Sequence, residues 1–151
     1  MKFICAFAMM LATTPVMAQQ AENPWSSDRS GHQSHTLDIR PKSQILAEAQ
    51  RYVGSGKVTR YAGPWCRDFV NLVAARAGVR LANNSRRAID AVHLGTRVSH
   101  PQPGDLVVMR HHVTIYAGHE GGRIVGLGGN QGRRVRYSHY SPHRVIAYVR
   151  L

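Results

Sequence analysis

The chain has 151 residues, and its 20 Lys and Arg against 8 Asp and Glu give a formal net charge of +12. This length suits a single domain with a modest core. Beyond the N-terminal segment one cysteine remains, Cys66, so an internal disulfide is excluded. The charge predicts attraction to polyanions, whether cell wall, outer-leaflet lipid or nucleic acid.

Residues 1–18 are predicted to form a secretory signal peptide. Lys2 provides a basic start, an apolar run follows from Phe3 to Ala12, and small or turn-prone residues end at Ala18. The apolar run is too short for a stable membrane anchor, and no other stretch approaches the ~20 apolar residues of a spanning helix. We therefore expect an exported protein, periplasmic or secreted, without a membrane anchor. A buried helix of the domain is the alternative for this segment.

Residues 19–41 are polar, contain Pro, Gly and Ser, and show no periodicity, so we expect a flexible leader. The domain is expected over residues 42–151. Its first helix is predicted to begin near Ser43, a capping residue, and to stop at Gly54. Between them apolar residues recur at three- and four-residue spacing.

Two further helices are predicted. The segment CRDFVNLVAARAG, which begins at Cys66, carries a stripe of apolar side chains and ends at Gly78. A third, short helix fits SRRAIDAVHLG, capped by Ser85 and ended by Gly95.

After Pro101 the apolar period changes from about 3.6 residues to 2, which predicts strands. Turn signals such as Asn130-Gln131-Gly132 separate the segments. Helices followed by strands predict an α+β domain with a mostly antiparallel sheet of about five strands. The five segments are GDLVVMR, HVTIYAG, GRIVGLGG, RRVRYS and RVIAYVRL.

Cys66 is the candidate nucleophile. A thiol at the start of a helix lies near unsatisfied N–H groups and the positive end of the helix dipole, which predicts a lowered pKa and a larger thiolate fraction. A histidine on a neighbouring strand, His112, can serve as the base, and Asn130 can accept from an imidazole N–H. The alternative is that Cys66 is only a small buried core residue.

The segment from Tyr61 to the C-terminus resembles the papain-like cell-wall peptidases known as CHAP domains and their NlpC-type relatives. The matching pieces occur in the family's order. GPWCRDFVNLVAARAGV resembles the nucleophile helix, PQPGDLVVM the strand before the base, HHVTIYAG the histidine strand, and GLGGNQ the strand ending in the third polar residue. The closing SPHRVIAYVR resembles the last strand of that group. The implied fold is papain-like, of the NlpC/CHAP type.

The resemblance implies a Cys-His-Asn triad in which Cys66 is the nucleophile, His112 the base and Asn130 the orienting residue. It implies hydrolysis of amide bonds in peptidoglycan, as an endopeptidase or N-acetylmuramoyl-L-alanine amidase. The backbone N–H of Cys66 and the hydroxyl of Tyr61 are candidate oxyanion-hole donors, although an ordinary packing tyrosine is the simpler interpretation of Tyr61. We expect a monomer with peptidoglycan as its partner, no metal, no cofactor and no nucleic acid. Thr114 stands where many relatives carry Gly or Ala.

Three histidines, His111, His112 and His119, lie in or near one predicted strand. If residues 106–117 are one continuous strand, alternation places His112 beside Thr114, on the face where the nucleophile helix would pack. His111 would then lie at the rim of the other face, and His119 follows into a turn, so His112 is the predicted base. The other, more apolar face comprises Val107, Met109, His111, Val113, Ile115 and Ala117.

A second hypothesis is a basic polyanion-binding protein on the same fold without catalysis. Arginines alternate with tyrosines in the last strands, a pattern that can contact phosphates and stack on bases. The simpler interpretation is that these arginines form the solvated face of an antiparallel sheet. The residues are Arg133, Arg134, Arg136, Arg144 and Arg150, with Tyr137, Tyr140 and Tyr148.

Overall fold

The structure is a computed structural model, and it describes residues 40–151. The predicted signal peptide at 1–18 and nearly all of the expected leader at 19–41 lie outside the described residues. The first described helix begins at Arg40, three residues ahead of its predicted start near Ser43.

In residues 40–151, three helices precede the sheet. Helix α1 spans Arg40–Gln50, α2 spans Cys66–Arg76, and a 3-10 helix, η1, spans Ala88–His93. The first intrahelical hydrogen bond of α2 runs from Phe69 N to Trp65 O at 2.9 Å. The third predicted helix is therefore present as a shorter 3-10 helix.

Six antiparallel strands form one sheet in the order β1-β6-β2-β3-β4-β5. The expected count of about five strands was one too low. The missed strand, β1, has three residues and pairs only with β6, so it is too short to show an alternating pattern. The strands are β1 Thr96–Val98, β2 Leu106–Met109, β3 Val113–Glu120, β4 Arg123–Gln131, β5 Arg134–Tyr140 and β6 Val145–Arg150, with a short 3-10 turn, η2, at Pro142–Arg144.

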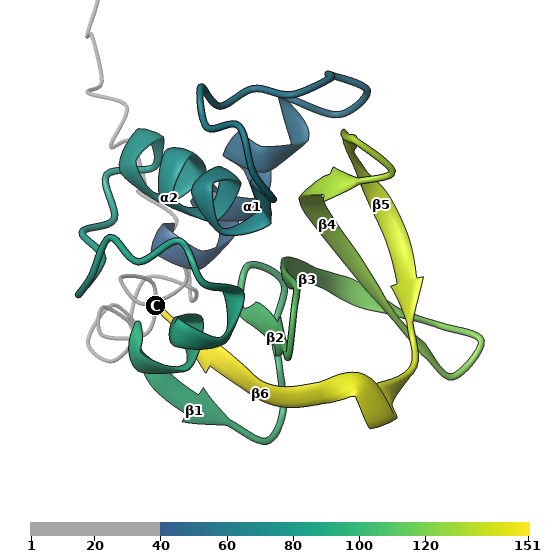
Figure 1. The fold of residues 1–151 in the computed structure, drawn as a ribbon. Helices are drawn as coiled ribbons and strands as arrows, with labels where there is room; N and C mark the ends of the chain where they lie inside the picture. Colours follow the sequence, from purple (N-terminus) through teal and green to yellow (C-terminus); the bar gives the residue numbers. More distant parts are fainter. Residues whose placement is uncertain (1–39) are drawn as a thin grey trace, which may run out of the picture. The chain divides into compact units, whose positions relative to one another are not determined.

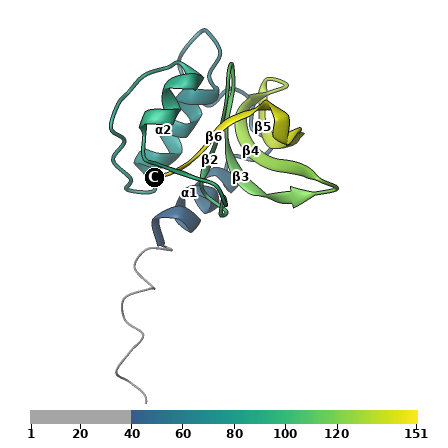
Figure 2. The same cartoon turned by 90° about the horizontal axis from the view of Figure 1, so that it is seen from below.

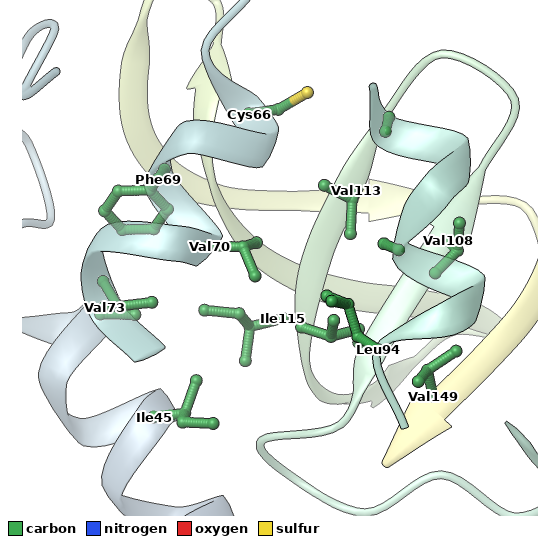
Figure 3. Close-up of a cluster of buried hydrophobic side chains, with 14 of the residues drawn as sticks. Ile45, Cys66, Phe69, Val70, Val73, Leu94, Val108, Val113, Ile115 and Val149 are labelled. Atoms are coloured by element: carbon green, nitrogen blue, oxygen red, sulfur yellow. The ribbon is translucent and has the colours of Figure 1, made fainter. Parts of the chain in front are cut away.

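The helices cover one face of the sheet (Figures 1 and 2). The main hydrophobic core lies between them, and Figure 3 shows part of it, with Phe69, Val70 and Val73 of α2 beside Ile115 of β3. A second, smaller cluster on the opposite face contains Val107, Met109, Tyr116, Ile124 and Tyr140.

The β2–β3 hairpin corrects the expected division of faces. Residues 106–117 are not one strand, because the chain reverses at 110–112, where Met109 N donates to His112 O at 2.8 Å. Val108 pairs with Val113 on the helix side. Val107 pairs with Thr114 and belongs to the opposite cluster. The predictions that Val107 and Val113 share a face, and that the nucleophile helix packs on the face of Thr114, were therefore wrong, since counting by twos does not hold across a turn.

Gly129 of β4 allows the sheet to approach the first turn of α2. A Cβ atom built on Gly129 would lie 2.5 Å from the Trp65 ring and 2.6 Å from Phe69 Cβ. Both side chains are buried, so neither has room to move away. The missing side chain at this position therefore fixes how closely α2 lies against β4.

We expect Gly129→Ala to lower the free energy of unfolding by about 1–3 kcal/mol, the usual cost of overpacking a core. Urea unfolding of both proteins measures the difference. Gly56→Ala is the matched control, because a Cβ there meets no atom within 4 Å. Equal stability of the Gly129→Ala and Gly56→Ala proteins would show that α2 and β4 are not in the close contact described.

Candidate functional site

Cys66 is the first residue of α2, and only 3% of its surface is exposed. Its sulfur lies on the side of the helix that faces Val113 (Figure 3). Backbone N–H groups of Val113, Arg67 and Cys66 itself lie close enough to the sulfur to favour its thiolate form. The thiol is therefore held between the start of α2 and the start of β3.

Burial raises the pKa of the Cys66 thiol above its ordinary value. The nearby backbone N–H groups act in the opposite direction, but desolvation outweighs them, and the charge of Asp68 adds to the increase in pKa. The expectation of a lowered pKa was wrong, because it counted the helix N-terminus and left out the burial of the sulfur. At neutral pH Cys66 rests as a thiol.

His112 ends the β2–β3 turn and directly precedes Val113, the residue whose N–H contacts the sulfur. Its ring is half-buried against Tyr140, with ring centroids 5.7 Å apart. Burial, assisted by the positive charge of Arg144, lowers the pKa of His112 to about 4. Its Nε2 atom is buried and has no hydrogen-bond partner in the described part of the chain. The imidazole is therefore neutral, with one nitrogen unengaged.

Asn130 lies at an irregularity of β4. It has a left-handed φ of 60°, and the register between β4 and β5 shifts between Gly128 and Gln131. Asn130 lines a small hollow of about 350 Å³ and has no hydrogen bond to His112 within residues 40–151. The other lining residues are Lys57, Ala62, Gly63, Trp65 and Arg133.

A buried polar group behind His112 was missed by the sequence analysis. Gln131 is 5% exposed and lies on the face of the sheet that holds Thr114. In the orientation that satisfies both amide atoms, Gln131 donates to the Tyr140 hydroxyl at 3.0 Å and accepts from Thr114 Oγ1 at 3.0 Å. Tyr140 therefore links Gln131 to the His112 ring. The sequence run Gly-Gly-Asn-Gln contains this glutamine. Because Asn130 adopts a left-handed backbone conformation, strand alternation does not predict on which face of the sheet the following Gln131 side chain lies.

Cys66 opens onto a groove of about 560 Å³, which we call the thiol groove. A larger hollow of about 680 Å³ lies along β1 and β6, but neither cysteine nor histidine lines it. Tyr61, the candidate oxyanion donor, shares the thiol groove with Cys66, and His111 lies at its edge. The remaining lining residues are Pro64, Arg86, Arg87, Ala88, Ile89 and Arg110.

The described residues hold no helix long and apolar enough to span a membrane. In the same residues, no three His, Cys, Asp or Glu side chains gather as a group that could bind a metal ion.

The α+β arrangement, with a six-stranded antiparallel sheet behind a cysteine-bearing helix, is consistent with an NlpC/P60-like fold. The chain is similar to a crystal structure from Staphylococcus aureus subsp. aureus Mu50 that is described as similar to a lipoprotein of the NLP/P60 family, with 26% sequence identity and a TM-score of 0.53. The likeness covers 75% of this chain but only 42% of that chain. No protein-family model matches the sequence, and a search of curated proteins finds no match.

Because burial raises the pKa of Cys66, we expect iodoacetamide to alkylate it only at higher pH in the folded protein than in urea. Mass spectrometry of the peptide that contains Cys66 follows the reaction and separates it from Cys5. The unfolded chain provides the control, since its thiol is solvated. If the pH midpoint of alkylation is lower in the folded protein than in urea, Cys66 has a lowered pKa, as expected from the helix N-terminus, and is not a thiol with a raised pKa.

Proposed function

We propose that this protein is an exported cysteine hydrolase that cleaves an amide bond in peptidoglycan. The observation that carries the proposal is the position of Cys66, whose sulfur opens onto the thiol groove and lies near the backbone of Val113, the residue directly after His112. The likeness to an NLP/P60 family lipoprotein structure supports both the reaction class and a location at the cell envelope.

In the proposed reaction, the Cys66 sulfur attacks the carbonyl carbon of the amide while neutral His112 accepts the thiol proton. The carbonyl oxygen becomes an oxyanion, to which the backbone N–H of Cys66 and the Tyr61 hydroxyl are the candidate donors. His112 then gives its proton to the leaving amine, and the C–N bond breaks to leave a thioester. A water molecule, deprotonated by His112, releases the acid and restores the thiol.

The third residue of the proposed triad is Asn130, as the family resemblance implies. For its amide oxygen to accept from the imidazole, the side chain has to turn from the hollow beside Trp65 towards His112. Tyr140 already contacts the imidazole, and it is held in turn by Gln131. We therefore propose that Tyr140 holds the ring in place and that Asn130 supplies the polar contact when substrate is bound.

Polyanion binding on the edge strand β5 is the second candidate function. Arg134 and Arg136 are exposed there, and Tyr137, which follows Arg136, is 41% exposed. Arg150, however, is engaged in an ion pair, with Nη2 at 2.9 Å from Asp105 Oδ2. Alkylation of Cys66 separates the two functions, because it abolishes hydrolysis and leaves polyanion binding intact.

We expect purified peptidoglycan to release soluble fragments with the wild-type protein and none with Cys66→Ala. His112→Ala should lose at least the ~10²-fold typical of a missing general base, whereas His111→Ala should retain most of the activity because His111 is exposed at the groove edge. Mass spectrometry of the fragments measures the rates and identifies the bond.

Circular dichroism confirms that each variant in this series is folded. A folded His112→Ala protein with near-normal rates would remove His112 from the mechanism. Release of fragments by the Cys66→Ala protein would contradict the proposed function.

The pH profile tests the state of the base. His112 accepts a proton only when it is neutral, so kcat/KM should fall as the pH drops through about 4, where burial places its pKa. Stopped assays on a soluble stem peptide, restricted to the pH range in which the protein stays folded, measure this limb. A fall in kcat/KM centred near pH 6.5, the pKa of a solvated histidine, would mean that a more exposed group is the base.

A further inference from the structure

The thiol groove has three arginines on its walls. Arg86 and Arg87 come from the segment before η1, and Arg110 comes from the β2–β3 turn. None of the lining residues is acidic. Positive charge therefore surrounds the opening in front of Cys66 from two different parts of the chain.

Arg86 is already engaged. Its Nε atom lies 3.2 Å from Asp68 Oδ1, and its guanidinium lies 3.6 Å from the centre of the Tyr61 ring. By contrast, the guanidinium groups of Arg87 and Arg110 have neither a hydrogen bond nor an ion pair with any described residue. The planar guanidinium groups of these two arginines can therefore donate hydrogen bonds to a ligand.

The wall that carries Arg87 is held in place by buried contacts. Arg67 is completely buried and donates to the carbonyl oxygen of Asn83 at 3.3 Å and to its side-chain oxygen at 3.2 Å. Ser85 donates to Asp90 Oδ2 at 2.6 Å and accepts from Arg87 N at 3.2 Å. The backbone around Arg87 is therefore fixed before a ligand arrives, which reduces the entropy lost on binding.

We propose that the thiol groove binds a peptide with a free carboxylate close to the amide that Cys66 attacks, and that Arg87 and Arg110 bind this carboxylate. The guanidinium fork matches the two oxygens of a carboxylate, and charge-assisted pairs of this kind are among the stronger hydrogen bonds. The apolar side chains of Pro64 and Ile89 leave room beside them for a short aliphatic residue. This inference rests on the proposed function and adds the chemical class of its substrate.

Binding to the inactive full-length Cys66→Ala protein tests the inference apart from catalysis. Soluble peptidoglycan stem peptides are compared by calorimetry with the same peptides after their carboxylates are converted to carboxamides. We expect the free acids to bind about tenfold more tightly, as one charge-assisted contact allows.

Arg87→Gln or Arg110→Gln in the same protein should remove most of the difference in affinity between the free acids and the carboxamides. Arg97→Gln is the matched control, since this exposed arginine of β1 lies outside the groove, and it should leave the ratio unchanged.

Equal binding of acid and amide, no binding of either, or a ratio that survives both groove substitutions would overturn the inference. Competition by inorganic phosphate but not by acetate would also overturn it and would assign the groove to phosphate. If the ratio depends on Arg87 and Arg110 but wild-type protein releases no fragment from peptidoglycan, the proposed function fails while carboxylate binding stands.

Discussion

The close packing of the first turn of α2 on β3 and β4 is the contact on which the candidate site depends. Gly129 has no side chain, so Trp65 and Phe69 can lie directly against β4. The same approach brings the Cys66 sulfur to the N–H of Val113 at the start of β3. Because one contact both closes the core and positions the thiol, a change that separates helix from sheet would disturb stability and reactivity together.

The same burial sets the protonation of the site. Cys66 is a thiol and His112 a neutral imidazole, so their reactivity depends on proton transfer during attack instead of a preformed ion pair. The thiolate is the form that oxidants attack, so a raised pKa protects a solitary cysteine. For a protein that works outside the cytoplasm, as we propose, this protection reduces the risk of oxidation before substrate binds.

The sequence predicted most of the fold because its helices and longer strands carry clear periodicity. It did not predict β1, whose three residues depend on pairing with β6. It placed Cys66 at a helix start, but it gave the wrong direction for its pKa, since burial depends on the close approach at Gly129. It selected Asn130 and overlooked Gln131, because a left-handed residue changes which side chain enters the buried face.

The high positive charge is divided among arginines with different surroundings. Arg67 is buried and holds the segment beside the groove, while Arg150 is paired with Asp105. Within residues 40–151, Arg87 and Arg110 have no such partners, and both line the groove onto which the thiol opens. A net charge of +12 therefore does not by itself indicate a nucleic-acid-binding surface.

Long-range attraction to an anionic wall falls off within about 10 Å at 0.1 M salt, whereas direct guanidinium contacts in a groove act at hydrogen-bond distance. The position of these arginines, more than their number, favours selection of an anionic substrate next to Cys66.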